Sequence, residues 1–550
     1  MPQNIYVKFA DMKFIISILR LILMSLTAVS LVAAEARKDI RAIDSSLQAP
    51  FIPRPGGSTL EPDLAFEQHV TTPGEVLVNG NTIAYEATAE TLVLRDDTGA
   101  PVASMFYVAY VAQRNPEDAD RPVTFIYGGG PGGSSSKQHL LGFGPRRIET
   151  DNYGATHNPP FKFLPNYQTL LDKTDLVYVD AIGTGFSRPL PGIDGKQFWG
   201  VDQDIDAFAR GIIRYITINH RWNSPKFLFG QSYGTTRSAG LVYVLQKKGV
   251  QMNGVILVAS VLNWGIRADG FEQNSIALVS SYAAAAWYHD RLADKPESLP
   301  VFLQKVREWA AGPYATALGK GMDISADEED SVALQLAAFT GLSVEFVKEN
   351  NLRVRLDRFR KELLRDEDWT VSRFDARFKG FDADDGGDKP EFDPASVTAL
   401  GSVTSTLHSY FENELKFHLN LEYLNPRSKI FIHLDWRHLA PGGTDFRKGA
   451  GDGMGLQLMP DTALDLSQAM RHNPELKVIS LNGWFDLTAP FFQAEYDLLY
   501  MGLPLALREN VKFCYYPAGH TSYVYPVALA QMKSDLAPFY DDAVKLKSGD

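Results

Sequence analysis

Six short segments, apolar in nearly every residue, constrain the fold of this chain more than any other feature of its sequence. Strands buried on both faces of a parallel sheet have this composition, because helices cover them on either side. Patterns typical of amphipathic helices, such as Val201–Arg221 and Ser238–Lys248, lie between the segments. We therefore expect an α/β fold with a mainly parallel central sheet flanked by helices. The six segments are Val123–Tyr127, Leu176–Val179, Phe227–Phe229, Gly254–Val258, Lys477–Leu481 and Val511–Tyr516.

The alternation of buried strands and helices is lost between residues 262 and 459. This stretch is rich in charged residues and helix formers, as Asp327–Asn351 and Leu352–Asp366 illustrate. It predicts a mostly helical cap at 262–459, inserted between two parts of the core at residues 75–261 and 460–550.

The region ahead of the core has a different character. Residues 35–74 are polar and contain five prolines, which predicts an extended N-terminal arm. Alternating apolar residues on either side of Asn79–Asn81 predict a β-hairpin at the start of the core.

The first 34 residues have the pattern of an export signal. Lys8 and Lys13 precede the apolar run Phe14–Ala34, which ends in small residues suited to cleavage after Ala34. We expect a signal peptide at residues 1–34 and a periplasmic or secreted protein, with no stable membrane association after cleavage. An uncleaved membrane anchor is the alternative.

Charge and cysteine content exclude several classes of function. The net charge of −12 disfavours a nucleic-acid partner, because an acidic surface repels phosphates. Cys514 is the only cysteine, so neither an intrachain disulfide nor a cysteine-ligated zinc site can form, and we expect it to pack as a small apolar residue in a strand.

The acidic stretch Asp382–Asp393 resembles a calcium loop in composition, but a glycine stands where a ligand is needed. We expect no metal and no organic cofactor.

The segment Gly230–Gly234 has the G-x-S-x-G pattern of a nucleophile elbow. It follows a buried strand and precedes a helical pattern, as that motif requires. The turn is tight, so its flanking positions need glycine, and it raises the hydroxyl of Ser232 above the sheet. A purely structural turn is the alternative.

A serine hydroxyl is a weak nucleophile and needs a base together with a carboxylate that orients the base. Asp486 follows the strand at Lys477–Leu481, and His520 follows the strand at Val511–Tyr516. The chain order serine, acid, histidine is the order found with this elbow, so Ser232, Asp486 and His520 are the candidate catalytic triad. Among the other histidines, His139 follows a glycine-rich loop, and this position would allow it to approach the candidate triad.

That loop, Gly128–Ser135, leaves the strand Val123–Tyr127. Glycine lets a backbone N–H come close to a reacting carbonyl, where it would stabilise the oxyanion together with the N–H of Tyr233. A phosphate-binding loop is the alternative, but the Lys-Ser/Thr ending of a P-loop is missing and Pro131 lacks an N–H.

These motifs, in this order, resemble the serine carboxypeptidase family of α/β-hydrolases, most closely its exported bacterial members. The resemblance covers about residues 120–260 and 475–540, and includes Asp180 with the segment Gly183–Ser187. It implies an α/β-hydrolase fold, and it implies that Gly130 and Tyr233 form the oxyanion hole.

The sequence departs from the family where substrate is bound. Family members hold the substrate's C-terminal carboxylate with an Asn and two Glu residues, and those positions hold Gly128, Gln231 and, by counting, Gly142 here. The acid-pH preference of a protonated carboxyl pair should therefore be absent. Gln231 could still donate an amide hydrogen bond to a carboxylate. Positive charge from Lys137, Arg146 or Arg147 is a further way to bind it.

The function expected from this combination is an exported serine-type carboxypeptidase that forms an acyl-enzyme on Ser232. Gly129, Gln231 and Trp484 are the expected substrate-binding residues. An esterase, amidase or acyltransferase with the same triad is the first alternative, because aromatic residues such as Trp484 would suit an apolar acyl group. A catalytically inactive binding protein is the second. The expected partner is a peptide or a small acyl substrate, and the oligomeric state stays open.

Overall fold

The computed structural model describes residues 64–545, apart from 114–120, 152–153, 269, 383, 385, 426 and 444–454. The expected signal peptide at 1–34 and most of the expected arm at 35–74 lie outside the described residues.

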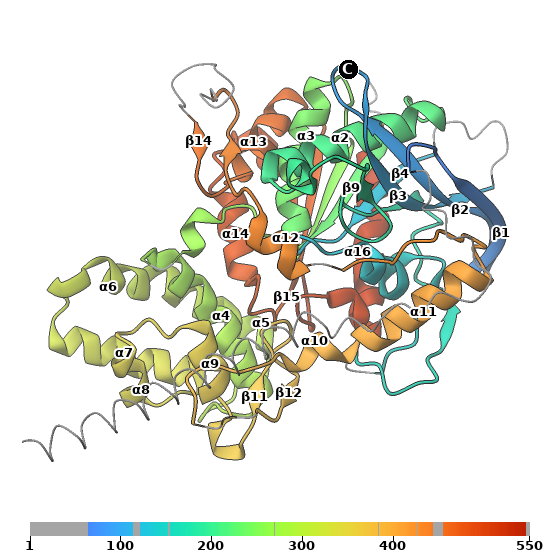
Figure 1. Ribbon diagram of the computed structural model, residues 1–550. Coiled ribbons are helices and arrows are strands. Elements are labelled where there is room, and N and C mark those ends of the chain that lie inside the picture. Colours follow the sequence, from blue (N-terminus) through green and yellow to red (C-terminus); the bar gives the residue numbers. More distant parts are fainter. Residues whose placement is uncertain are drawn as a thin grey trace, which may run out of the picture. The chain divides into compact units, whose positions relative to one another are not determined.

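A ten-stranded sheet forms the centre of the described chain (Figure 1). Its strands follow the order β1-β2-β3-β7-β4-β9-β10-β15-β16, and β8 pairs with β3. All pairs from β7 to β16 are parallel, whereas β1, β2, β3 and β7 pair in antiparallel fashion. Their bounds are β1 His69–Val78, β2 Asn81–Arg95, β3 Pro101–Ala112, β4 Val123–Tyr127, β7 Asp175–Val179, β8 Arg188–Pro189, β9 Lys226–Gln231, β10 Gly254–Val258, β15 Lys477–Gly483 and β16 Val511–Tyr516.

This arrangement is the α/β-hydrolase fold, as the sequence predicts. Each of the six apolar segments forms a strand of the parallel part, and four of these strands are buried at every residue. The hairpin around Asn79 is also confirmed, because Val78 pairs with Asn81. Cys514 is buried in β16, where burial raises its pKa to about 11.

Helices cover both faces of the sheet. Apolar residues of α2, α3 and α13 share one core cluster with the strands, and those of α16 and α11 share the other (Figure 1). The helices that flank the sheet are α2 Val201–Ile218, α3 Tyr233–Lys247, α13 Ala463–His472, α14 Phe491–Leu499, α15 Leu505–Arg508 and α16 Pro526–Ala543.

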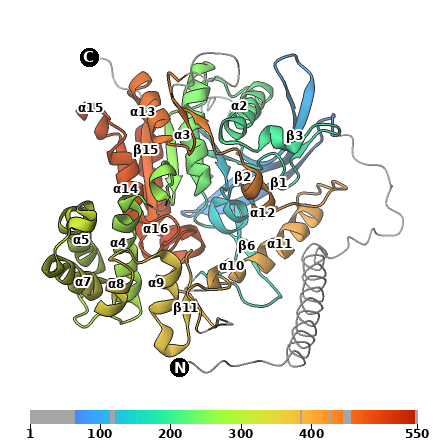
Figure 2. The same ribbon diagram turned by 60° about the vertical axis from the view of Figure 1, so that its left-hand side comes forward.

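Residues 262–459 contribute no strand to the main sheet within the described part of that range. Helices α4, α5, α7 and their neighbours pack around a third apolar cluster, beside α14 (Figure 2). Helix α7 ends at Gly341, whose φ of 71° is left-handed, so the helical pattern at Asp327–Asn351 forms two helices instead of one. The helices here are α4 Glu272–Tyr288, α5 Leu299–Trp309, α6 Ala315–Gly319, α7 Ala326–Thr340, α8 Val344–Glu349, α9 Leu356–Glu362, α10 Pro394–Thr398, α11 Leu400–Asn413 and α12 Arg427–His433.

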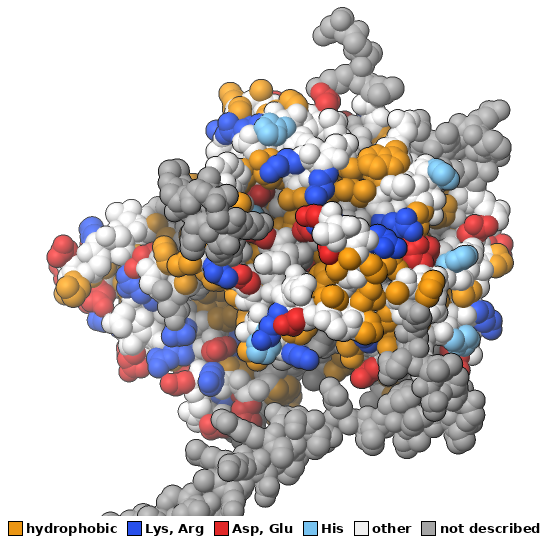
Figure 3. Space-filling view, turned by 45° about the horizontal axis from the view of Figure 1, so that its top comes forward, with side chains coloured by type: hydrophobic (Ala, Val, Ile, Leu, Met, Phe, Trp, Pro, Cys, Tyr) orange, Lys and Arg blue, Asp and Glu red, His pale blue; other side chains and the backbone are white. Residues whose placement is uncertain are grey.

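Three short strand pairs and a helical turn complete the description of these residues. The small strands are β5 Arg146–Ile148, β6 Phe163–Pro165, β11 Thr370–Val371, β12 Lys379–Gly380, β13 His438–Leu439 and β14 Leu456–Gln457, and a short helical turn spans Gln138–Phe143. Acidic and basic side chains are interspersed on the face drawn in Figure 3. Among the described residues, none of the helices has both the length and the apolar character needed to cross a membrane.

Candidate active site

Ser232 lies between the end of β9 and the start of α3. Its φ of 58° and ψ of −128° are strained for a residue with a side chain, and this geometry produces the sharp turn. A Cβ on Gly230 would stand 2.1 Å from the carbonyl oxygen of Gly234, and one on Gly234 would stand 2.9 Å from that of Gly128. Close backbone approach therefore requires both glycines of the motif.

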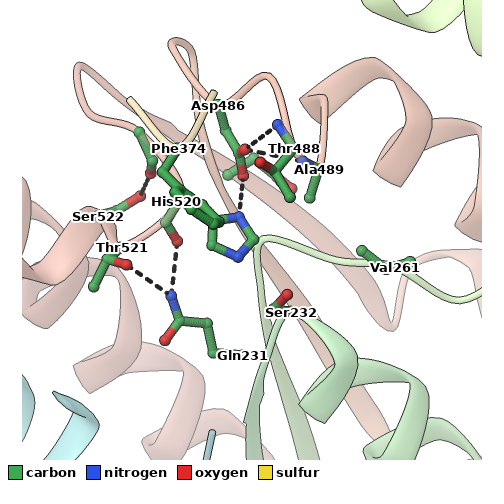
Figure 4. A network of polar contacts seen from close by, with 12 residues as sticks. Gln231, Ser232, Val261, Phe374, Asp486, Thr488, Ala489, His520, Thr521 and Ser522 are labelled. Atoms are coloured by element: carbon green, nitrogen blue, oxygen red, sulfur yellow. Dashed lines mark hydrogen bonds and ion pairs between the residues drawn. The ribbon is translucent and has the colours of Figure 1, made fainter. Parts of the chain in front are cut away.

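His520 and Asp486 meet beside this turn. The imidazole Nδ1 lies 2.7 Å from Oδ2 of Asp486, and both side chains are buried. The other carboxylate oxygen accepts the N–H groups of Thr488 and Ala489, at 2.8 and 2.9 Å. With Nδ1 facing a carboxylate, the second ring nitrogen is left to act as the base. Figure 4 shows that nitrogen on the side of the ring that faces the hydroxyl of Ser232.

The glycine loop packs directly against the elbow. A Cβ on Gly129 would lie 2.5 Å from the carbonyl oxygen of Gln231 and 2.7 Å from the amide nitrogen of Tyr233. Tyr233 is the first residue of α3, where an N–H has no acceptor within the helix. The carbonyl of Gly128 accepts from Arg237 of α3 at 2.8 Å, which ties the loop to the helix behind the serine. Gly129 and Gly130 line one cavity with Ser232, and Gly129 packs against the amide nitrogen of Tyr233.

Gln231 lines the same cavity as Ser232, but its side chain is occupied by protein partners. Its amide nitrogen donates to the carbonyl of His520 at 2.9 Å and to the hydroxyl of Thr521 at 3.2 Å. Its carbonyl oxygen accepts from Gln138 at 2.6 Å and from Tyr523 at 2.5 Å. In this structure the Gln231 amide is therefore turned to partners within the protein, and donation to a substrate carboxylate stays a prediction. The side chain joins the elbow to the loop of His520 (Figure 4).

The residue that contacts Gln231 in the structure is Gln138, and not Gly142, the position reached by counting along the chain. Gly142 has no side chain, and a Cβ there would meet the ring of Tyr523 at 3.5 Å. Gln138 lies one helical turn earlier and is 6% exposed. Spacing alone could not find it, because the chain turns into a helix at this point.

Trp484 is not brought to the serine. Its ring stacks on Tyr515 at a centroid distance of 4.6 Å and packs edge-on against Phe491 at 4.8 Å. It belongs to the apolar cluster under the α4–α7 helices and lines a different cavity, with Trp287 and Tyr288. Its aromatic ring is the reason to expect substrate binding from the sequence, but in the structure the ring packs against Tyr515 and Phe491.

His139 is also excluded from the chemistry by its surroundings. It is buried, stacks on Tyr178 at 4.6 Å and shares a hydrogen bond of 2.5 Å with the hydroxyl of Tyr110. Burial lowers its pKa to about 3, so it is a neutral core residue.

A short segment that carries no motif, Arg373–Arg377, holds both catalytic loops in place. The carbonyl of Phe374 accepts the N–H of His520 at 2.6 Å, and that of Arg373 accepts the N–H of Leu487 at 3.0 Å. Sequence reasoning missed this segment because its role lies in its backbone carbonyls, which any residue type supplies.

The carboxylate of Asp375 reinforces the same contact. It accepts the N–H of Gly519 at 3.0 Å and pairs with Arg377, whose guanidinium also donates to the carbonyl of Pro517 at 2.8 Å. The side chains of Asp375 and Arg377 are nearly fully buried. The loop that carries His520 is therefore anchored by a charged pair from outside the core sequence.

The segment Trp436–His438, near the end of the 262–459 region, contacts the elbow and two core helices. Trp436 packs edge-on against Tyr233, with ring centroids 6.1 Å apart. The imidazole of His438 lies between Asp202 of α2 and Asp465 of α13, at 2.6 and 2.8 Å. Burial alone would lower the pKa of His438, but hydrogen bonds to the two carboxylates outweigh it and raise the pKa to about 10. A protonated histidine thus ties this segment to two core helices.

The cavity at Ser232 has a volume of about 280 Å³. Apolar side chains of Leu141, Phe374, Phe378 and Val403 form much of its wall, and His520 lines it as well. Lys137 lies at this cavity, whereas Arg146 pairs with Glu414 and Arg147 donates to Thr150 and to the carbonyl of Val524. Within the described residues, no group of three or more His, Cys, Asp or Glu side chains has the arrangement of a metal site.

Comparisons with known proteins give one family match and several distant structural likenesses. The serine carboxypeptidase family model matches residues 96–268, which include the glycine loop and the elbow, while Asp486 and His520 lie outside it. No curated protein matches the chain.

Solved structures of other hydrolases are similar to the chain at low identity. A prohormone-processing carboxypeptidase of Saccharomyces cerevisiae, Kex1(Δ)p, is 13% identical over 85% of this chain and 93% of its own, with a TM-score of 0.48. A carboxyl esterase of Bacillus coagulans is 12% identical over 83% and 98%, with a TM-score of 0.35. The family match confirms the predicted resemblance to the serine carboxypeptidases over residues 96–268, and the protein is a serine hydrolase.

Proposed function

We propose that this protein is an exported serine hydrolase that releases residues from the C-terminal end of peptides through an acyl-enzyme on Ser232. The observation that carries the proposal is the hydrogen bond between His520 and Asp486 beside an elbow serine, in one cavity with the glycine loop. The family match over the loop and the elbow supports a peptide substrate.

The proposed reaction has two acyl-transfer steps. The Oγ of Ser232 attacks the scissile carbonyl carbon while His520 takes its proton, and Asp486 stabilises the resulting imidazolium. The oxyanion accepts the N–H groups of Gly130 and Tyr233. As the C–N bond breaks, His520 gives the proton to the leaving amine. Water then attacks the ester with His520 again as base, which releases the acid and restores the serine.

Hydrolysis of small esters or amides by the same residues is the second candidate. The engagement of the Gln231 amide within the protein favours it, because a peptide's terminal carboxylate would have to displace those two hydrogen bonds. The apolar wall with Phe374 and Phe378 would suit an acyl group.

A panel of unblocked peptides and simple aryl esters, followed by mass spectrometry, tests the proposal. Stepwise shortening from the C-terminus, lost in Ser232→Ala, is the expected result. Ester hydrolysis with intact peptides would replace the peptidase by the second candidate. Absence of any turnover, together with absence of labelling at Ser232, would indicate an inactive binding protein. N-terminal sequencing of the exported protein tests the signal peptide, with Glu35 expected as the first residue.

A further inference from the structure

Gln231, the last residue of β9, stands directly before the nucleophile and contacts the loop that carries the base. Its amide nitrogen lies 2.9 Å from the carbonyl oxygen of His520 and 3.2 Å from the hydroxyl of Thr521 (Figure 4). A carbonyl oxygen can only accept a hydrogen bond, so the atom that faces it must be the amide nitrogen. The side chain therefore connects the chain at Ser232 to the chain at His520.

The oxygen of the same amide is held as well. It accepts from the amide nitrogen of Gln138 at 2.6 Å and from the hydroxyl of Tyr523 at 2.5 Å. Gln231, Gln138 and Tyr523 are all buried, and hydrogen bonds shielded from water in this way are stronger than exposed ones. The four contacts together fix the direction in which the amide points.

The backbone of His520 is held at both of its polar groups. Its N–H donates to the carbonyl of Phe374 at 2.6 Å, and its carbonyl accepts from Gln231. The imidazole ring is fixed separately by its contact with Asp486 at 2.7 Å. Of these three contacts, the one with Gln231 comes from the elbow itself. A general base must stay within hydrogen-bond reach of the hydroxyl that it deprotonates, and a misplacement of about 1 Å can cost on the order of 10²-fold in rate.

We propose that Gln231 is a positioning residue for the base: its amide holds the backbone of His520 beside Ser232, and it does so equally at acid and at alkaline pH. An amide group neither gains nor loses a proton between about pH 4 and 9. Burial raises the pKa of Tyr523, so its hydroxyl stays a donor to Gln231 over the same range. The role concerns the serine hydrolase chemistry itself and is the same for a peptide and for an ester.

The substitution Gln231→Glu tests the proposal because it makes the contact with His520 depend on a proton. A protonated carboxyl group can donate to the carbonyl of His520 as the amide does, whereas a carboxylate turns its lone pairs toward that oxygen. Burial and the facing carbonyl favour the protonated form, while the donors Gln138 and Tyr523 favour the ionised one. The variant should therefore lose the contact as pH rises.

A purely electrostatic effect of the new carboxylate would have the opposite pH dependence. A negative charge at position 231 would keep the imidazole of His520 protonated and unable to act as a base, so the loss would be greatest at low pH and would disappear as pH rises. The direction of the pH dependence thus separates the two effects. The titratable or charged groups that contact this position or line the cavity beside it are His520 with its partner Asp486, Tyr523, Lys137, and Asp375 with its partner Arg377.

The measured quantity is the rate at which a fluorophosphonate labels Ser232, because this rate reports activation of the serine and requires no knowledge of the natural substrate. The rate of Gln231→Glu is divided by that of the wild-type protein at each pH from 5 to 9, so that titration of His520, common to both, cancels. We expect a ratio near one at pH 5 that falls by about tenfold to 100-fold by pH 9. Gln231→Met, which cannot donate, should be slowed to a similar extent at every pH.

Gln246→Glu in α3 is the matched control. The amide nitrogen of Gln246 also donates to a backbone carbonyl, that of Ala469 in α13 at 3.4 Å, but this contact does not involve the catalytic loops. The control should be labelled at the wild-type rate at every pH. Thermal unfolding of each variant, measured at the same pH values, identifies those that fail to fold.

The proposal is overturned by a ratio that stays near one at every pH, because the contact would then not be needed to position the base. A ratio that rises with pH would assign the effect to charge, and a ratio that is low at every pH together with a lowered Tm would assign it to damage to the fold. If Gln231→Met were labelled normally but had a raised KM for peptides with a free C-terminus, Gln231 would bind substrate instead. Failure of the peptidase proposal would leave the labelling test intact, because that test uses no peptide.

Discussion

The substitution Gly129→Ala tests whether the glycine loop and the elbow form one oxyanion site. The added Cβ would stand 2.5 Å from the carbonyl oxygen of Gln231, 2.7 Å from the amide nitrogen of Tyr233 and 2.9 Å from that of Gly234. All three are backbone atoms, so none can rotate away, and the loop and the elbow must move apart. The Tyr233 N–H would then miss the developing oxyanion. Loss of one such donor typically lowers kcat by about 10²–10³-fold, or roughly 3–4 kcal/mol of transition-state stabilisation.

Steady-state kinetics on an aryl ester, with thermal unfolding in parallel, measure this effect. The matched control is Gly401→Ala in α11, where the new Cβ would meet only one ring carbon of Phe161 at 3.9 Å. The control should keep wild-type kcat and gain up to about 1 kcal/mol in stability, as alanine does within a helix. Hydrolysis of the ester by Gly129→Ala at the wild-type rate would show that the contact between the glycine loop and the elbow does not position the Tyr233 N–H.

Three further substitutions follow from buried charges. His438→Gln leaves two carboxylates without their cation, which should lower the free energy of unfolding by on the order of 3–5 kcal/mol at pH 6. Since the pKa of this histidine is raised to about 10, the difference from wild type should fade as pH rises toward 10. A Tm difference that grows with pH would contradict this. Burial, and to a smaller extent the nearby Asp497, raises the pKa of Asp461 to about 6. Its ionisation therefore destabilises the fold as pH rises from about 4 to 6. Asp461→Asn should raise Tm at pH 7 by the equivalent of about 2–3 kcal/mol and leave Tm unchanged at pH 4. Asp375→Asn weakens the pair with Arg377 that anchors the catalytic loop, so kcat should fall about tenfold with KM nearly unchanged, and an unaltered kcat would show that the loop is held without it.

The parts of the fold that sequence predicts best are those set by local patterns. The run Val123–Tyr127 is buried at every residue and forms a strand, because few other structures bury five consecutive side chains completely. The elbow at Ser232 can be predicted because its flanking positions accept only glycine. A Cβ on Gly230 or on Gly234 would stand 2.1 or 2.9 Å from a backbone carbonyl oxygen. Asp486 and His520 could be paired from their places after successive strands.

The features that sequence misses depend on contacts between distant segments. Gln138 meets Gln231 across 93 positions of the chain, and no local pattern marks either as one of a pair. Phe374 reaches His520 through a backbone carbonyl, which carries no signal in the side chain. Trp484 shows the converse, because an aromatic residue next to a catalytic motif looks the same whether it packs in a core or lines a binding site.

Covalent labelling tests the central claim, that Ser232 is the activated nucleophile of a serine hydrolase. The mature protein is treated with a fluorophosphonate, and peptide mapping locates the adduct while residual esterase activity is followed. We expect one equivalent of adduct on the peptide containing Ser232, loss of activity in proportion to labelling, and greatly slowed labelling in His520→Ala. An adduct on another residue, or full activity after Ser232 is labelled, would contradict it.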